Sequence, residues 1–509
     1  ALGTKLHQET GGNPFFLGEI VRLLVSEGRL ASTWDSHVLP ADVRAVVVRR
    51  LDRLGAGCRA ALAVGALLGD GFDVGHFETV LAAPSLGEAA GAGIPPINGD
   101  GSSIGDVPSM VDLLERAVRD RVLVESDGRY AFAHALIRRV VIDDIEPSRR
   151  AAWHARIAAA IERATGAQTD AVAGELVRHF ASAGTMAGLR KAFAYACRGA
   201  EHAARELGWE EAARLYAIAL DVGARSGALD DVEPVELRLA LADALRRSGD
   251  VTSARTQCRE ATSACRALHR PDLLARAALI YAGPVPDFYC VDVDARAALE
   301  DACRNTELTD DVLRARLKAR LASDIIAANE IDQLERASVL GDEAAAAARR
   351  AGDSGALARA QFAGFYLAAL GTKPRTSGAQ VIMPPTLPSL QELLDAAEEA
   401  GDFEFAAEIR HTRTVAMFAL GEADAYRAEH EALATVAAAS RVPEALWLAD
   451  AIGAMRATVE GRFAEGRHLS DQALATGLRM QLTNAAGVTS VSRSCGTACK
   501  DDSRSCCRS

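Results

Sequence analysis

The chain has 509 residues and a net charge of −12 at pH 7, with 49% hydrophobic, 25% charged and only 5% aromatic residues. This length exceeds a single hydrophobic core and predicts about two to four domains. An acidic chain repels phosphate backbones, so nucleic acid is not the expected partner of its bulk. No run reaches the roughly 18 apolar residues that a membrane span needs, and no signal peptide opens the chain. We therefore expect a cytoplasmic protein without membrane contact.

Residues 1–30 predict a loop followed by one helix. Thr10-Gly-Gly-Asn-Pro14 is a turn, and Pro14 stands where the first helical turn tolerates a proline. Apolar residues then recur at helical spacing from Phe16 to Leu24, and Gly28 ends the run. The chain begins without Met and within a helical pattern, so we interpret it as a fragment of a longer protein.

Residues 39–146 predict a winged-helix-like domain. Apolar periodicity indicates a helix that opens at Leu39 and further helices over 58–68, 76–81 and 110–118. Two short β-prone runs then flank Ser126-Asp-Gly-Arg129, which is a hairpin signal and would form the wing. Another helix follows the hairpin. Residues 85–109, rich in Gly, Ala, Pro and Ser, predict a flexible insertion.

Residues 148–482 predict a tetratricopeptide-like α-solenoid. Gly-containing junctions separate amphipathic helices, and an acidic residue often begins the next helix. Gly208 and Gly249 are 41 residues apart, and Gly421 and Gly461 are 40 apart, a period typical of stacked helix–turn–helix units. The predicted fold class is thus mainly α, a winged-helix domain followed by this solenoid. Residues 484–509 lose all periodicity and form either a disordered or an artefactual tail.

The cysteines indicate neither disulfides nor a metal site. Cys258 and Cys265 lie about 10.5 Å apart along one predicted helix, beyond disulfide reach, and are interpreted as small core residues. The four cysteines of the tail lack the paired Cys-x2-Cys spacing of structural zinc. The sequence also contains no His-Glu-x2-His motif, so we expect neither catalytic residues nor a metal-binding site.

Three segments, in order and at these distances, resemble the end of the AAA+/STAND ATPase region of large bacterial LuxR-type regulators and cyclase-linked ATPases. They are Thr10-Gly-Gly-Asn-Pro-Phe-Phe-Leu-Gly-Glu-Ile-Val-Arg-Leu-Leu24, Leu39-Pro-Ala-Asp-Val-Arg44 with Arg49-Arg-Leu-Asp-Arg-Leu54, and Tyr130-Ala-Phe-Ala-His-Ala-Leu-Ile-Arg138. The resemblance covers roughly residues 5–220 and extends to the rest only as a repeat class. It implies that residues 1–30 end the nucleotide-binding region, with a winged helix and a tetratricopeptide-like array after it.

The resemblance places two residues near a nucleotide. Pro14 matches the proline of a Gly-x-Pro motif that packs near the adenine, and His134 stands where a winged-helix histidine approaches the phosphates. A histidine suits that place because its ring donates hydrogen bonds to anions. The alternatives are that Pro14 only starts a helix and that His134 is only a capping or buried polar residue.

The phosphate-binding parts of such an ATPase are lacking. No Gly-x4-Gly-Lys-Ser/Thr motif occurs, and no apolar strand ending in paired acids precedes Pro14. We expect no enzymatic activity and no cofactor in this chain alone, while ATP or ADP is implied for the full-length parent. Arginines such as Arg49, Arg138 and Arg149 give the winged-helix region local basic character, but a packing role is expected there rather than DNA contact.

Three functions follow from these patterns. In the first, the chain is the regulatory and ligand-binding part of an ATP-dependent transcriptional regulator. The winged helix would couple an upstream nucleotide-binding domain to the repeats, which would bind a protein or a small-molecule inducer. The second is an interaction scaffold without nucleotide dependence. The third, an enzyme site within the solenoid, lacks a visible acid, base or metal set.

Overall fold

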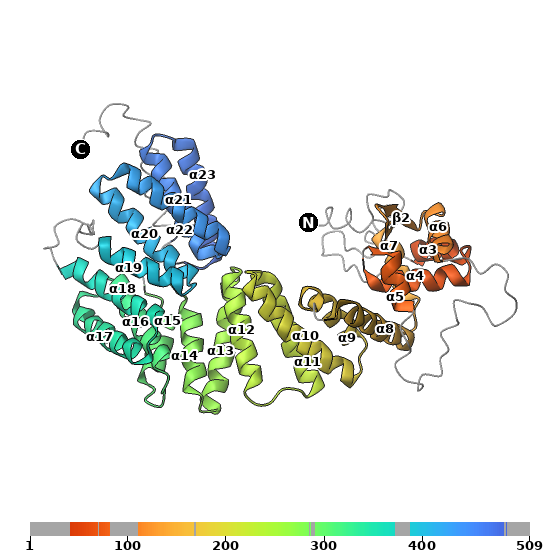
Figure 1. The fold of residues 1–509 in the computed structure, drawn as a ribbon, viewed down its shortest axis with the longest axis horizontal. Helices are drawn as coiled ribbons and strands as arrows, with labels where there is room; N and C mark the ends of the chain where they lie inside the picture. The colour runs from red at the N-terminus through yellow and green to blue at the C-terminus, as the bar shows by residue number, and fades with distance from the viewer. Residues whose placement is uncertain are drawn as a thin grey trace. The chain divides into compact units, whose positions relative to one another are not determined.

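The computed structural model describes residues 41–69, 71–81, 110–166, 169–284, 286, 291–371, 387–482 and 485. The chain folds into two compact units, Ala1–Ala196 and Cys197–Ser509, and the division falls inside helix α10 (Met186–Arg205). Helices dominate both units, as the sequence predicts (Figure 1). No helix within the described ranges is long and apolar enough to cross a membrane.

The first unit combines helices with one small sheet. In chain order its elements are α3 (Ala41–Asp52), α4 (Ala56–Leu68), β1 (Phe72–Asp73), α5 (Val74–Leu81), α6 (Met110–Arg119), β2 (Leu123–Ser126), β3 (Arg129–Phe132), α7 (Ala135–Asp143), α8 (Pro147–Thr165), a 3₁₀ turn (Asp170–Val172), α9 (Ala173–Ser182) and the first part of α10. The helices expected from the sequence in 39–146 are present. The winged-helix assignment stays a prediction, and the insertion 85–109 lies outside the described residues.

The predicted hairpin is confirmed. Strands β2 and β3 pair antiparallel, with Leu123 opposite Phe132, and the turn has positive φ at Asp127 (52°) and Gly128 (75°). Two left-handed residues match the twist of the flanking strands, which is why Asp-Gly predicts this turn. Strand β1 pairs antiparallel with the other edge of β3 and gives the order β1-β3-β2. Sequence analysis did not predict β1, because two residues carry no alternation.

Helix α4 is the centre of the first unit's core. It packs against α6, α7 and α8, and its residues Leu62, Val64 and Ala66 have no exposed surface. Gly65 permits close packing here, because a Cβ at this position would lie 2.6 Å from Cζ of Phe72. The ring of Phe72 therefore places the sheet directly on α4.

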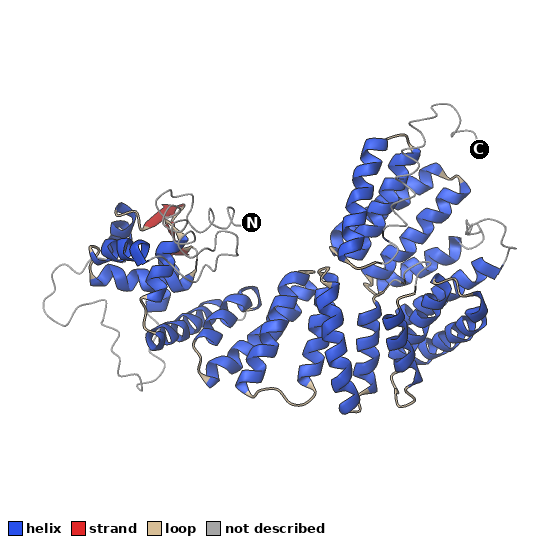
Figure 2. Cartoon of the chain, turned by 180° about the vertical axis from the view of Figure 1, so that it is seen from behind, coloured by secondary structure: helices blue, strands red, loops and turns tan. Residues whose placement is uncertain are grey.

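The second unit is an α-solenoid. Its helices are the rest of α10, α11 (Trp209–Ser226), α12 (Glu233–Arg247), α13 (Val251–Ala267), α14 (Pro271–Ala282), α15 (Val293–Arg304), α16 (Asp311–Ala327), α17 (Leu334–Ala351), α18 (Ser354–Gly371), α19 (Leu387–Glu399), α20 (Phe403–Leu420), α21 (Ala423–Ser440), α22 (Pro443–Val459) and α23 (Phe463–Arg479), with a 3₁₀ turn at Ile331–Gln333. From α11 onward, each helix packs on the next, and α12, α14, α16 and α18 also pack in series. Figure 2 shows the stacked helices of this unit in blue. Stacking of this kind buries a continuous core along the array.

The junctions follow the predicted capping chemistry with one exception. Gly352 and Gly421 end α17 and α20 in the left-handed conformation, which glycine adopts without strain. Asp402 begins α20, where its side chain accepts a hydrogen bond from the amide of Phe405. The exception is Gly208, whose φ is −87°, while Leu207 before it has the positive φ of 58°.

The last helices of the array meet the first. Trp209 Nε1, at the start of α11, donates to the carbonyl of Ser440, at the end of α21, over 3.2 Å. Gln481, just after α23, donates to Thr252 Oγ1 over 2.8 Å. Val251, which begins α13, is buried in one apolar cluster with residues of α20 to α23. Helical periodicity gives no sign of these contacts.

The interpretation of Cys258 and Cys265 as core residues is confirmed. Cys258 and Cys265 are free thiols on α13, each 1% exposed. Burial raises the pKa of Cys258 to about 12 and that of Cys265 to about 11. Both groups are therefore neutral core residues at physiological pH. The cysteines of the predicted tail 484–509 lie outside the described residues.

Candidate functional site

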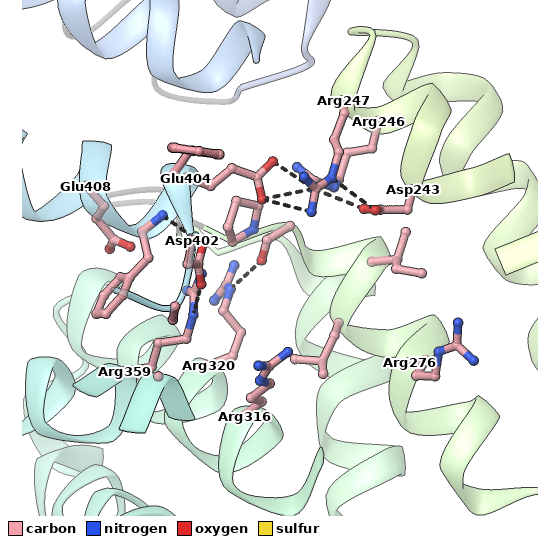
Figure 3. A pocket seen from close by; sticks show the side chains of 18 of the residues that line it. Asp243, Arg246, Arg247, Arg276, Arg316, Arg320, Arg359, Asp402, Glu404 and Glu408 are labelled. Atoms are coloured by element: carbon pink, nitrogen blue, oxygen red, sulfur yellow. Dashed lines mark hydrogen bonds and ion pairs between the residues drawn. The ribbon is translucent and has the colours of Figure 1, made fainter. Parts of the chain in front are cut away.

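The second unit contains a pocket of about 640 Å³, which is the candidate site. Residues of α11, α12, α14, α16, α18 and the start of α20 line it, so both early and late helices of the array supply its walls. Aromatic rings of Trp209, Phe362 and Phe405 contribute apolar surface. Ten charged side chains also line the pocket (Figure 3), namely Asp243, Arg246, Arg247, Arg276, Arg316, Arg320, Arg359, Asp402, Glu404 and Glu408.

Arg246 is the centre of a buried ion cluster at the edge of this pocket. The Arg246 guanidinium contacts Asp243 at 3.1 Å, Glu404 at 2.9 Å and Glu444 at 3.2 Å. Arg246 and Glu404 are 6% and 8% exposed. Burial raises the pKa of Glu444, while the charge of Arg246 acts in the opposite direction. A guanidinium has five N–H donors, so one arginine on α12 joins carboxylates from α20 and α22.

Arg247 lies beside this cluster and packs on an aromatic ring. Its guanidinium lies 4.7 Å from the ring centroid of Trp209, within cation–π range. It also forms ion pairs with Asp243 at 3.0 Å and Glu404 at 3.7 Å. Trp209 is the ring whose N–H binds Ser440, so this stack belongs to the same contact between early and late helices.

Arg359 and Arg320 bind protein groups on the other side of the pocket. Arg359 pairs with Asp402 at 2.6 Å and lies 4.5 Å above the ring of Phe405. Arg320 donates to the carbonyls of Gly283 at 2.9 Å and Ala282 at 3.0 Å. These carbonyls end α14, where a helix leaves its last acceptors unsatisfied. Both arginines therefore stabilise helix ends and hold the wall in place.

Two charged groups of the pocket, Arg276 and Glu408, lack such partners, and a third, Arg316, has only a long ion pair. Within the described ranges, no carboxylate lies at ion-pair distance from Arg276, and its side chain is exposed. Arg316 is 46% exposed and reaches only Asp353, at 4.0 Å. Glu408 is 5% exposed, and no described residue forms a hydrogen bond or an ion pair with its carboxylate. Burial raises the pKa of Glu408 to about 7, although Arg359 and Arg320 oppose the shift.

The two residues singled out in the sequence lie elsewhere. Pro14 falls outside the described residues, so its predicted place near a nucleotide stays a prediction. His134 belongs to the first unit, where it precedes α7 and is half-buried. Its carbonyl accepts a hydrogen bond from the amide of Ile137 over 3.0 Å, and its side chain makes no capping bond. Its predicted role toward a nucleotide remains untested.

Part of the basic character of residues 39–150 serves the fold. Arg138 Nε donates to the carbonyl of Ala66 over 2.8 Å. Arg178, on α9, donates to the carbonyls of Leu67 at 3.2 Å and Leu68 at 2.9 Å. These three carbonyls end α4, so both arginines satisfy acceptors that the helix leaves open. Arg138 of this region thus has a packing role, and Arg178, which lies beyond residue 150, has the same role.

A buried histidine pair lies next to Arg178. The Nδ1 atoms of His154 and His179 are 2.9 Å apart, and Arg178 Nη2 lies 2.8 Å from His179 Nε2. Burial lowers the pKa of His154 to about 4 and that of His179 to about 2, and the charge of Arg178 adds to both shifts. Both rings are therefore neutral at physiological pH. The described residues hold no group of three His, Cys, Asp or Glu side chains placed to share a metal ion.

The sequence does not predict the pocket. Asp402 lies in a Gly-containing junction of the predicted kind, and both Asp402 and Glu404 line the pocket. The one sequence feature that points to the pocket is the pair Arg316 and Arg320, which lie four residues apart and therefore on the same face of one helix. Periodicity places such residues on a face but does not say what lies opposite.

No protein-family model matches the chain, and none of the curated proteins matches it. Among solved structures, the chain is similar to a Signal Transduction ATPase with Numerous Domains (STAND) from Pyrococcus horikoshii, which has a tetratricopeptide repeat sensor. The two chains are 13% identical with a TM-score of 0.30, and the match covers 96% of this chain and 59% of that chain. This chain thus spans less than two thirds of that protein. A likeness at this score does not support an argument about function.

Proposed function

We propose that the second unit is the ligand-binding sensor of a signal-transduction regulator and that its inducer binds in the pocket. The observation that carries the proposal is the pocket itself, because the buried Glu408 and the exposed Arg276, neither of which has an ion-pair partner among the described residues, both line it. A buried, unpaired carboxylate such as Glu408 is costly to the fold. Such a group is therefore better explained by a ligand than by stability.

The dimensions favour a small molecule over a macromolecule. Ligand pockets have volumes of roughly 300–1,000 Å³, and this pocket of about 640 Å³ falls in that range. Apolar walls with a few convergent polar groups are also typical of small-molecule sites. A protein partner, the other occupant expected from the sequence, requires a broader surface.

The position of Glu404 suggests how binding is transmitted. Its side chain lines the pocket and also pairs with Arg246, which joins α12 to α20. A ligand that contacts Glu404 or its neighbours changes the free energy of this joint. A ligand shifts a conformational equilibrium only through such differential contacts. Ligand binding in the pocket would thereby change the packing of α12 against α20.

The binding part of the proposal is tested with a variant that fills the pocket. Ser323 is half-buried and lines the pocket from α16, so Ser323→Trp would occupy its space. Ala428→Trp on the exposed face of α21 is the matched control. The full chain would be incubated with a small-molecule cell extract and analysed by native mass spectrometry. We expect an adduct with the wild type and the control but not with Ser323→Trp. An adduct that persists in Ser323→Trp, or no adduct at all, would leave the alternative of an interaction scaffold.

The nucleotide part of the proposal comes from the resemblance at Pro14 and His134 and needs its own test. Calorimetry with ATP and ADP would compare this chain with one extended upstream by about 250 residues, the span of a large domain. We expect binding only to the extended chain, and weaker ADP binding after His134→Ala. If the extended chain binds no nucleotide, the coupling is wrong and the sensor acts without it.

A further inference from the structure

The pocket has two arginines whose donors are available to a ligand. Four of its six arginines are held by carboxylates or by helix-end carbonyls, as described above. Arg276 on α14 and Arg316 on α16 remain, and these two helices pack against each other. Guanidinium groups match the geometry of carboxylate and phosphate oxygens, to which they donate paired hydrogen bonds. This side of the pocket is therefore suited to an oxyanion.

Glu408 gives the other side of the pocket a different chemistry. Figure 3 shows it across the pocket from Arg276. Its side chain is 5% exposed and no described residue donates to its carboxylate, so the carboxylate is available to accept a hydrogen bond from a ligand. A cation is disfavoured there, because Arg359 and Arg320 act on Glu408 from nearby. A neutral O–H or N–H donor satisfies the carboxylate without adding positive charge.

Taking the proposed sensor function as its basis, we infer that the ligand is a small molecule with an oxyanionic group and a neutral hydrogen-bond donor. Its phosphate or carboxylate binds Arg276 and Arg316, and its hydroxyl or amide N–H donates to Glu408. The anion fixes one end of the molecule and the donor fixes the other. Neutral sugars and cations are excluded from this class, since they carry no anionic group for Arg276 and Arg316 to bind.

The anionic end is tested with inorganic phosphate and malonate, which represent the phosphate and carboxylate sources. Calorimetry on the full chain would compare the wild type with the double variant Arg276→Gln/Arg316→Gln. Arg225 and Arg349 are exposed and do not line the pocket, so Arg225→Gln/Arg349→Gln is the charge-matched control. We expect one or both anions to bind the wild type and the control about tenfold or more tightly than the double variant, because charge-assisted bonds are lost. Equal binding to all three proteins, or none, overturns the inference.

The donor end is tested with glucose 6-phosphate, which adds hydroxyl groups to the same anion. Glu408→Leu removes the acceptor with little change in volume. We expect this variant to weaken glucose 6-phosphate while leaving inorganic phosphate unchanged. Equal weakening of both probes would mean that Glu408 acts through the fold, which overturns its assigned contact. Should the extract yield an adduct that Ser323→Trp abolishes and that is neutral or cationic, the ligand class is wrong and the sensor function stands.

Discussion

The guanidinium of Arg246 lies 2.9 Å from a carboxylate oxygen of Glu404, although 158 residues separate them in the chain. Both side chains are buried, and Glu444 adds a third helix to the same cluster. In a solenoid most contacts join neighbouring repeats. This ion pair instead joins α12 to α20, which are eight helices apart in chain order. It borders the pocket, so the contact that closes the array and the candidate ligand site share residues.

Arg246→Ala is expected to destabilise the second unit strongly. The change leaves the buried Glu444 without its counter-charge and Glu404 with only Arg247 at 3.7 Å, and loss of one partner of a buried pair costs about 3–5 kcal/mol. Arg225→Ala removes an exposed pair with Asp221, which typically contributes about 0–1 kcal/mol. Urea unfolding followed by tryptophan fluorescence would measure both, since Trp209 lies at the closing contact. Similar losses in the two variants would contradict the role assigned to Arg246.

Two glycines should respond to alanine with opposite signs. Gly352 ends α17 at φ 68°, where a Cβ adds strain, so Gly352→Ala should cost about 1 kcal/mol. Gly364 lies on the exposed face of α18 with nothing near its Cβ position. Gly364→Ala should stabilise by about 0.5–1 kcal/mol, because alanine is the better helix former. Thermal unfolding of both variants beside the wild type tests the pair, and a shift of the same sign in both would refute it.

The helical array was predictable because its signals are local. Gly352, Gly421 and Asp402 act on the residues beside them, so the sequence carries their meaning directly. The Asp-Gly turn predicts its hairpin for the same reason. Strand β1 was missed because it depends on Tyr130 and Arg129 in another segment. Leu207 took the left-handed conformation expected of Gly208, a choice that local propensity does not predict.

The pocket was not predictable because it depends on distant pairings. Arg246, Glu404 and Glu444 look like ordinary charges on helix surfaces until the array brings them together. Glu408 gives no sign in the sequence that it is buried or that it lacks a partner. The family resemblance instead predicts site residues at Pro14 and His134, which belong to the first unit and not to the pocket.

The pH dependence of stability should report the burial of Glu408. Its pKa rises from 4.5 to about 7 in the fold, so the unfolded chain loses this proton first as pH rises. Stability from this group is therefore complete below pH 4.5 and is lost as pH rises through about 7. Glu408→Gln removes this loss, so its melting temperature relative to the wild type should increase from pH 5 to pH 8.

Glu335→Gln is the control for that experiment, because Glu335 is an exposed acid on α17. Its difference from the wild type should stay constant over the same range. A constant difference for Glu408→Gln as well would mean that Glu408 ionises as a solvated acid. That result would also remove a reason to place a ligand donor beside it.

The histidine pair of the first unit should have fixed and different tautomers. Arg178 can only donate, so His179 Nε2 accepts its hydrogen bond and the ring proton of neutral His179 is on Nδ1. That proton is donated to His154 Nδ1, which leaves the His154 proton on Nε2. Nitrogen-15 NMR of the imidazoles should find one ring in each tautomer at pH 7. Two identical tautomers would contradict the hydrogen-bond chain.

The same pair should limit stability in acid. The pKa of His154 falls from 6.5 to about 4 and that of His179 to about 2, because burial disfavours their charged forms. Below pH 6.5 the unfolded chain therefore binds protons at these histidines, whereas the folded chain does not. The free energy of unfolding falls as the pH decreases from 6.5 through about 4. Arg178→Gln removes a nearby positive charge, so His179 should take up its proton at a higher pH than in the wild type. An unchanged titration in that variant would mean that burial alone, without Arg178, keeps the pair neutral.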